Sequence, residues 1–489
     1  MTGNTNRGLA PIHLSERLPL RHYLAIDGGG GAHVFAALPS VAAARPVSSP
    51  RHADLLIVAG PISARLSPAV AELARALPAP AQALLVMPAP DTSESAALQR
   101  LFPGAPMVTL APGDAEGDVL RVVEAMRALG APTGALTIGD APAYAPPLIS
   151  MPAANTHALA TELNAFSLGP LQPFTAGPLR LWLICDGEQV LECRVDAGYA
   201  ARDLARRMAA TGWRAAADLA AWLDPLAPVA GRLAYVRAVE ALQGACAPAH
   251  VEQAREAALA LERAMNHLNW ATRLFRLLAA PRLTQQAADL AWRARALAAS
   301  VPPVSASAQP AHSAELRRQL AARVERLARS VARDRLLQLR TRGVGALPPT
   351  WIAEAAVDGP NAAAPAPGAN DRNDRNDCHA RLLTRLTQAA TDLRQSASAA
   401  PLHPVQAEPA GGRWEVPAGV AEGAAWGPRG RLAARLTSAG GAGPTRVEWA
   451  SRPSARTLAL LPRLLEGQIV ADAEIIIASL DLSMAEADG

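Results

Sequence analysis

Strand-like and helical segments alternate through the first 130 residues, and this alternation constrains the fold more than any other feature of the chain. The run YLAIDGGGGAHVFAAL, residues 23–38, gives a strand, a glycine-rich loop and a helix in succession. A strand, a helix, two strands and a helix follow as ADLLIVAG (53–60), LSPAVAELARAL (66–77), ALLVMPAP (83–90), PMVTLAPG (106–113) and DVLRVVEAMRALG (118–130). Alternation of this kind predicts a parallel α/β sheet with flavodoxin-like winding.

The glycine-rich loop at 28–31 raises the question of phosphate binding. Such a loop after a strand can cradle a phosphate on its backbone N–H groups. Here it fits neither G-x-x-x-x-G-K-[ST] nor an uninterrupted G-x-G-x-x-G, since position 33 is His33. The sequence therefore disfavours a phosphate site.

The pattern changes after residue 130. Residues 131–165 are rich in Pro and Ala, which predicts a linker. Two strand-like runs, LRLWLIC and QVLECRV, then flank Asp186-Gly187, a strong hairpin signal.

Helical spacing follows from Ala200, and residues 248–278 carry a broad apolar stripe typical of a long helix. The sequence thus predicts an α/β domain over 20–130, a linker over 131–165 and an α+β, mainly helical domain over 166–489.

Composition narrows the classes of function. A chain of 489 residues is too long for one compact core. All its basic residues are Arg, mixed with Asp and Glu at a formal charge of +4, which indicates solvated helix faces and no nucleic-acid partner. No apolar run approaches the roughly 18 residues of a spanning helix. Residues 1–23 lack the apolar centre of a secretory signal. We therefore expect a cytoplasmic chain.

Four cysteines are present, and none forms a C-x-x-C pair: Cys185, Cys193, Cys246 and Cys378. The first two lie on opposite arms of the predicted hairpin, where they could approach each other, but a cytosolic chain keeps its thiols reduced. An Fe–S or zinc site needs three or four soft ligands at suitable spacing. We expect buried structural thiols and no bound metal.

Several motifs of the second half resemble one family. They are LGPLQPFTAGPLRLWLICDGEQV, GYAARDLARRM, AYVRAVEALQG, RTRGVG (340–345), DCHARLLTRL and the C-terminal LPRLLEGQIVADAEIIIASLDLSMAEAD. They are similar to the D subunit of NADH-quinone oxidoreductase (respiratory complex I) and to the large subunit of membrane-bound [NiFe] hydrogenases. This resemblance implies a hydrogenase-large-subunit-like domain over 166–489.

The first half, over SPRHADLLIVAGPISARLSPAVAELARALPAPAQALLVM, resembles the B subunit of complex I and the small subunit of those hydrogenases. That family holds a [4Fe–4S] cluster on four cysteines. The resemblance places them on Gly28, Gly31, Pro90 and Asp114, and none of these can supply a thiolate. The cluster is therefore expected to be absent, and no other cofactor is expected.

The quinone-site residues of the D-subunit family are replaced as well. Gln172 and Ala176 stand where its opening motif has two histidines. The family's quinone-binding His falls on Ala201 and its Tyr on Pro225. Neither Ala nor Pro can hydrogen-bond a quinone carbonyl through a side chain. The nickel ligands of the hydrogenases, two Cys pairs, are missing too.

Other residues retained from the family are interpreted as structural. His267, in ALERAMNHLNW, has no second ligand four residues on, so we expect a hydrogen-bonded histidine on a helix face. Arg340 and Arg342 flank a turn whose glycines should need positive φ.

The resemblance implies a fused, redox-inactive structural or coupling subunit of a complex I-like or membrane-bound-hydrogenase-like ion-translocating complex. Its partners would be membrane-arm proteins, antiporter-like and like the H subunit of complex I, together with other peripheral subunits. It would lie on the cytoplasmic face of the inner membrane and contact the membrane only through partners. Two alternatives stay open: a working quinone-reducing subunit with a modified site, and a free-standing soluble regulator or assembly factor.

Overall fold

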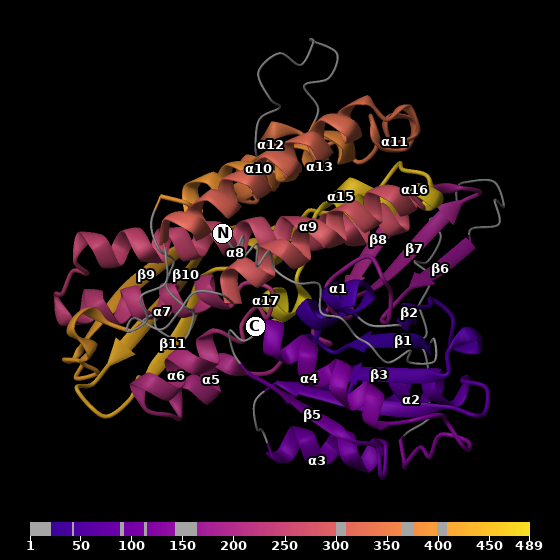
Figure 1. Ribbon diagram of the computed structural model, residues 1–489, viewed down its shortest axis with the longest axis horizontal. Helices are drawn as coiled ribbons and strands as arrows, with labels where there is room; N and C mark the ends of the chain where they lie inside the picture. The colour runs from indigo at the N-terminus through magenta and orange to yellow at the C-terminus, as the bar shows by residue number, and fades with distance from the viewer. Residues whose placement is uncertain are drawn as a thin grey trace, which may run out of the picture.

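The computed structural model describes residues 21–41, 44–88, 92–111, 115–141, 164–299, 310–362, 376–398 and 408–489. Two bodies lie side by side: a layered parallel-sheet body from the N-terminal residues and a larger, mainly helical body from the rest (Figure 1). Of the sequence-predicted site positions, Pro90 and Asp114 lie outside the described residues.

The N-terminal sheet has five parallel strands in the order β2-β1-β3-β4-β5. This is the strand order of flavodoxin-like doubly wound sheets, as the alternating pattern predicts. The strands are β1 (Arg21–Asp27), β2 (Ala44–Pro46), β3 (Leu55–Ala59), β4 (Gln82–Pro88) and β5 (Met107–Leu110). The helices are α1 (Ala32–Val41), α2 (Ser67–Arg75), α3 (Thr92–Leu101) and α4 (Ala115–Ala128). Strand β2 and helix α3 are additions to the predicted set.

Each face of this sheet buries its own hydrophobic cluster. Leu55 and Ile57 pack with helices α1 and α4, whereas Leu56 and Val58 pack with α2 and α3. Every residue of β3 is buried, as a central parallel strand covered on both faces requires. The α1/α4 face also takes up Trp222 of the helical body. The sheet therefore meets the helical body through this face.

The predicted linker 131–165 is divided differently in the structure. The Gly134 carbonyl accepts from the Ala81 amide at 3.0 Å, and the Gly139 amide donates to the Leu101 carbonyl at 2.8 Å. Residues 131–141 are thus bound to the sheet body. Residues 142–163 lie outside the described part, and a strand already begins at Asn164.

The helical body begins with a three-stranded antiparallel sheet, β6 (Asn164–Leu168), β7 (Arg180–Asp186) and β8 (Gln189–Asp196). The last two form the predicted hairpin. Its two-residue turn is Gly187-Glu188, one residue later than predicted, because Asp186 pairs with Gln189 in the ladder. Gly187 has the positive φ, +54°, that such a turn requires.

Helices dominate the rest of this body. In chain order they are α5 (Leu204–Ala209), α6 (Trp213–Ala220), α7 (Pro228–Gln243), α8 (Ala249–Leu277), α9 (Pro281–Ala299), α10 (Pro310–Arg333), α11 (Arg335–Thr341), α12 (Pro349–Glu354) and α13 (Cys378–Ser396). The long helix predicted over 248–278 is α8. It packs against α9 and α13, and α10 packs against both of these, so the four form a bundle (Figure 1).

A second antiparallel sheet and short helices complete the chain. They are β9 (Gly419–Gly427), β10 (Gly430–Ser438), β11 (Arg446–Ser451), α14 (Pro453–Ala459), α15 (Leu461–Leu465), α16 (Val470–Ser479) and α17 (Met484–Asp488). Helix α7 lies on β9 and β10. The C-terminus returns to the centre of the molecule, beside the N-terminal sheet (Figure 1).

The two bodies share an extended contact. Helix α1 packs against α8 and α9, and α4 packs against α9. At this contact an Arg295 guanidinium nitrogen donates to the His33 carbonyl at 3.3 Å. Among the described residues, no helix combines the length and the apolar character that a bilayer crossing needs.

Candidate functional site

The candidate site lies where the glycine-rich loop after β1 meets the helical body. Asp27, the last residue of β1, accepts the amides of Gly29 at 2.9 Å and of Gly31 at 3.0 Å on one carboxylate oxygen. Gly28 donates its amide to the Ala59 carbonyl at 2.8 Å. Burial raises the pKa of Asp27, although both amides act in the opposite direction. Three of the loop's amides are therefore already bound within the chain.

Gly28 and Gly31 leave no room for a side chain. A Cβ at Gly28 would lie 2.2 Å from the Pro61 carbonyl oxygen, and one at Gly31 would lie 2.2 Å from the Ala59 Cβ. Both distances are far inside van der Waals contact. A cysteine at either position would require the β3 backbone or its following loop to move. These residues do not fit a cluster, for the steric reason as well as for their missing thiolates.

The loop's other side is closed by the helical body. A Cβ at Gly29 would lie 3.2 Å from the Ala200 Cβ and 3.6 Å from the Ala485 Cβ. Gly177 approaches the same place, because a Cβ built on it would lie 3.8 Å from the Gly29 Cα. The loop that carries the mapped cluster positions thus touches three segments of the helical body.

The mapped quinone positions differ in exposure, and one of them adjoins this contact. Ala201 is exposed, one residue past Ala200, and Pro225 is buried in the loop before α7. Positions mapped to the cluster therefore adjoin the segment of the mapped quinone His, and neither mapped quinone residue offers a polar side chain there.

The C-terminal segment forms hydrogen bonds with the parts of the helical body that contact the glycine-rich loop. The Asp488 carboxylate accepts the amides of Gly198 at 2.9 Å and Ala200 at 2.8 Å. Ala176 exchanges backbone hydrogen bonds with Leu482 and Met484 at 3.0 and 2.8 Å. The segments around Ala176 and Ala200 are therefore held together by the chain's own tail.

Gln172 also has an internal role. Its side-chain oxygen accepts the amides of Phe174 at 2.8 Å and Thr175 at 3.0 Å, which fixes the turn before β7. Its amide nitrogen donates to the Thr175 hydroxyl, so both ends of the side chain are bound within the loop.

A buried network of charged side chains, which the sequence did not predict, lies next to this junction. Asp481 accepts from Arg273 at 3.0 Å and lies 3.5 Å from Arg429 and 3.6 Å from Arg385. Arg429 also pairs with Asp224. We call these five residues the buried charge network.

Neighbouring side chains complete the hydrogen bonds of this network. The Ser483 hydroxyl donates to Asp224 at 3.0 Å. In the orientation that satisfies both ends of its amide, Asn266 donates to Asp481 at 3.1 Å and accepts from Arg429 at 3.2 Å. Every one of these partners belongs to the chain itself, and Asp481 and Ser483 belong to its C-terminal tail. The network is therefore built to hold the tail.

A further buried carboxyl lies at the edge of the network. Glu486 accepts the amide and hydroxyl of Ser454 at 2.8 and 3.0 Å. Burial raises the pKa of Glu486 to about 7, and the charge of Arg429 opposes this rise. The carboxyl thus links α17 to the start of α14.

His267 corrects a prediction. It is fully buried on α8, and neither ring nitrogen has a hydrogen-bond partner among the described residues. Burial lowers its pKa well below the usual value, and the charges of Arg385, Arg263 and Arg429 lower it further. It is therefore a neutral core side chain and not the hydrogen-bonded helix-face histidine expected, because the bundle covers this side of α8.

Arg340 and the glycines of the turn after α11 are structural, as predicted, whereas the Arg342 side chain is exposed. Arg340 donates to the Leu278 carbonyl at the end of α8, at 2.6 Å. Gly343 and Gly345 have φ of +75° and +57°. Three of the cysteines are buried free thiols, and burial raises the pKa of each: Cys185, Cys193 and Cys378. Cys246 is exposed, which corrects the expectation that all four would be buried.

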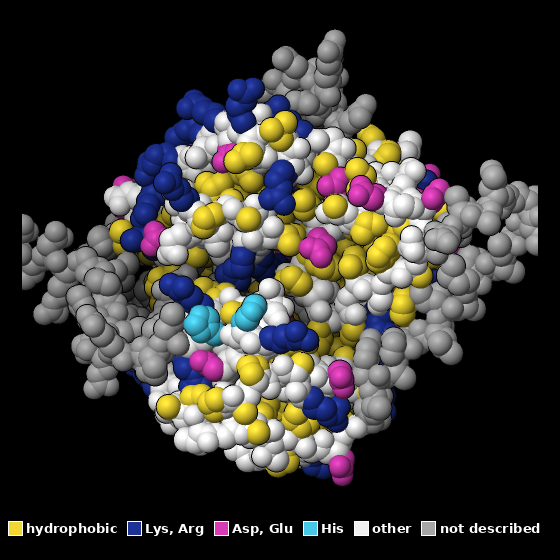
Figure 2. Space-filling view, turned by 90° about the vertical axis from the view of Figure 1, so that its right-hand side faces the viewer, with side chains coloured by type: hydrophobic (Ala, Val, Ile, Leu, Met, Phe, Trp, Pro, Cys, Tyr) yellow, Lys and Arg dark blue, Asp and Glu magenta, His cyan; other side chains and the backbone are white. Residues whose placement is uncertain are grey.

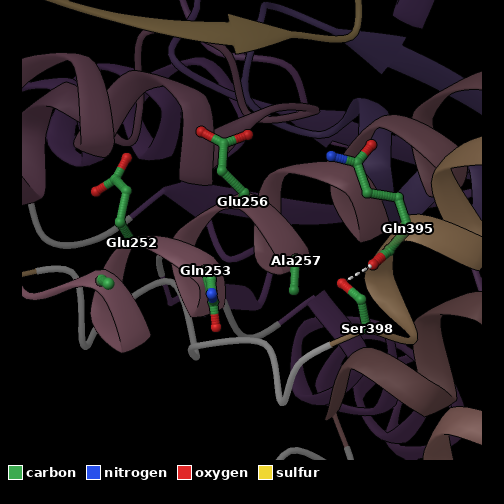
Figure 3. A pocket seen from close by; sticks show the side chains of 7 residues that line it. Glu252, Gln253, Glu256, Ala257, Gln395 and Ser398 are labelled. Carbon is green, nitrogen blue, oxygen red and sulfur yellow. Dashed lines mark hydrogen bonds between the residues drawn. The ribbon is translucent and has the colours of Figure 1, made fainter.

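A surface pocket of about 390 Å³ lies between the start of α8 and the end of α13, and none of the mapped cluster or quinone positions lines it (Figure 3). Glu252 and Glu256 line it, and both accept from Arg237. The Ser398 hydroxyl at its rim donates to the Gln395 carbonyl at 2.7 Å. Its carboxylates are already paired. The described residues contain no group of three or more His, Cys, Asp or Glu arranged to hold a metal ion.

Sequence comparison relates the C-terminal part of the chain to one family. Residues 402–489 match the model of the respiratory-chain NADH dehydrogenase, 49 Kd subunit. The D 1 subunit of NADH-quinone oxidoreductase from Roseiflexus castenholzii is 36% identical over 109 residues, which cover 22% of this chain and 26% of that one. The corresponding D subunit from Geobacter sulfurreducens is 33% identical over 110 residues, 22% and 28% of the two chains. The matched region spans about a quarter of these curated relatives.

Structural comparison extends the likeness of fold. A chain of the membrane-bound sulfane sulfur reductase, an archaeal respiratory membrane complex, superposes with a TM-score of 0.58 at 20% identity. The superposition covers 68% of this chain and all of that one. The C-terminal segment is thus homologous to the D subunit of NADH-quinone oxidoreductase, and the chain shares the fold of a protein from a respiratory membrane complex.

Proposed function

We propose that this chain is a redox-inactive structural or coupling subunit of a complex I-like or membrane-bound-hydrogenase-like ion-translocating complex. Its helical body takes the part of the D subunit, and its N-terminal sheet body takes the part of the B subunit. Homology of residues 402–489 supports the first assignment. The parallel sheet of order 2-1-3-4-5, docked on the helical body through α1 and α4, supports the second.

One observation carries the redox inactivity. Gly28 and Gly31, which correspond to a pair of cluster ligands, pack so closely that even a methyl group would overlap the chain. Electron transfer through a [4Fe–4S] cluster needs thiolates and a cavity for the inorganic core. Ala201 and Pro225 offer no donor or acceptor for a quinone headgroup. The chain keeps the scaffold that joins the two bodies and lacks the groups that would pass electrons.

The partners follow from the same assignment. A chain built like a peripheral subunit would sit on the cytoplasmic side of the inner membrane, against antiporter-like proteins and a protein like the H subunit of complex I. Its role would be to transmit shape changes or to hold neighbouring subunits in register.

The test is metal analysis and low-temperature EPR on the native complex, purified anaerobically. We expect no stoichiometric iron or nickel assigned to this chain, with membrane-arm proteins in the same preparation. The G28C/G31C double variant is the informative companion, and we expect no gain of iron because neither position has room for a side chain. A reducible [4Fe–4S] signal from this chain would refute the proposal. Quinone-dependent reduction by the assembled complex would favour the alternative of a modified quinone site.

A further inference from the structure

The end of α10 and the whole of α11 form a basic surface with protruding leucines. Residues 326–342 contain six arginines and a single acidic residue, Asp334. Asp334 is used as the N-cap of α11, where it accepts the Leu337 amide at 3.1 Å. The region therefore carries a strong local excess of positive charge in a chain whose formal total is +4.

Two leucines stand on the outer side of α11. Leu337 and Thr341 face the core, whereas Leu336 and Leu339, three residues apart, are 72% and 80% exposed. These are the most exposed of the large apolar side chains in the described part of the chain. Residues three apart lie on one helix face, so both leucines project in the same direction.

Arginines surround the leucines. Arg326, Arg329 and Arg333 follow helical spacing along the exposed side of α10. Arg335 is the first residue of α11, and Arg342 follows its last residue. No ion pair joins any of these five to a described carboxylate. Figure 2 shows the face of the molecule that carries α11, with arginine side chains gathered along its upper edge. We call these five arginines and two leucines the α11 ridge.

We propose that the α11 ridge binds an anionic phospholipid surface directly. Guanidinium groups pair with phosphate, and leucines on a short helix enter the boundary between headgroups and acyl chains. Charge complementarity favours a negatively charged leaflet, which attracts each basic side chain near it. Both leucines stand out from the surface, which suits insertion into a bilayer better than docking in a partner's groove. This inference rests on the proposed function only in placing the chain at a membrane.

The experiment is vesicle co-sedimentation of the full chain. One set of vesicles is phosphatidylcholine alone, and the other contains phosphatidylcholine with phosphatidylglycerol. We expect binding to the anionic set only, and weaker binding as salt rises. Two variants, R329E/R333E/R335E and L336S/L339S, should each lower the partition coefficient by about tenfold or more. The matched control is R413E/V420S, which changes an exposed Arg and an exposed apolar residue near the start of β9.

Each outcome decides the inference. Loss in both ridge variants, with the control unchanged and circular dichroism spectra alike, supports it. Equal binding to neutral vesicles, or no effect of the ridge variants, overturns it. If vesicles are not bound but the ridge variants release the chain from its complex, the partner is an acidic protein and the lipid proposal fails. Vesicle binding does not depend on the iron content of the chain, so iron analysis tests the redox-inactive assignment separately.

Discussion

At the scale of single residues, the buried carboxyl of Glu262 makes the stability of the fold depend on pH. It projects from α8 to the start of α7, where it accepts the amides of Val229 at 2.6 Å and Ala230 at 3.0 Å. Burial raises the pKa of Glu262 to about 8, although both amides act to lower it. The folded chain therefore holds this proton at pH values where the unfolded chain, with a pKa near 4.5, has lost it.

The sign of the resulting pH dependence follows by linkage. A carboxyl whose pKa is raised by folding stabilises the native state below the unfolded pKa, and that contribution is lost as pH rises from about 4.5 to 8. E262Q should therefore flatten the fall in the free energy of unfolding between pH 5.5 and 8. At pH 5.5 we expect E262Q to be less stable than wild type by about 1–3 kcal/mol, because one hydrogen bond is lost. Urea denaturation at both pH values measures this. The control E72Q, on the exposed side of α2, should keep the wild-type dependence, and a curve for E262Q as steep as wild type would contradict the prediction.

Asp481 tests the buried charge network. D481N leaves Arg273, Arg385 and Arg429 without the carboxylate they share, so we expect a loss of about 3–5 kcal/mol in the free energy of unfolding. The matched control is D289N, because Asp289 pairs with arginines on an exposed surface, where about 0–1 kcal/mol is expected. Chemical denaturation compares the two. Equal losses in the free energy of unfolding for D481N and D289N would mean that the buried charge network stabilises the fold no more than a surface ion pair does.

At the scale of elements, glycine packing decides how close β1, β3 and α1 can lie. Replacing Gly31, at the start of α1, by alanine would force its methyl group onto the Ala59 methyl of β3. We expect G31A to cost about 1–3 kcal/mol through overpacking. G134A is the control, since a Cβ there meets no atom within 4 Å. Thermal denaturation should separate the two, and a G31A protein as stable as G134A would show that the loop can relax.

The elements that pattern missed share a physical cause. Strand β2 has three residues, too few for a period to be read. Strand β6 lies in a stretch rich in Pro and Ala, and it pairs only because β7 offers an edge. Helix α3 begins among Ser and Thr residues that read equally well as a turn. Strong apolar runs such as β3 and the long stripe of α8 were predictable. Their burial produces a hydrophobic pattern within consecutive residues of the sequence.

At the scale of the molecule, stability depends on how the two bodies meet. Ala200 lies against Gly29 of the other body, and its neighbour Ala201 is exposed. A200L should wedge the bodies apart and lower stability by about 1–3 kcal/mol. A201L, with the same chemical change one residue later, should stay near wild type. Calorimetry checks this, and we expect the A200L transition to broaden or divide as the two bodies unfold less cooperatively. Identical traces for the two variants would place the contact elsewhere.

The sequence by itself determined the order of the strongly apolar strands and helices, the hairpin, the positive-φ glycines after α11 and the lack of a thiolate at each position mapped to a cluster. These features depend on residue type and on short-range periodicity. Only the tertiary structure decided that Gly28 and Gly31 are closed to any side chain, that His267 is buried without a hydrogen bond, and that Asp481 gathers three arginines. Such contacts join residues far apart in the chain, so no local pattern contains them, and they form only when the strands, helices and C-terminal tail have packed together.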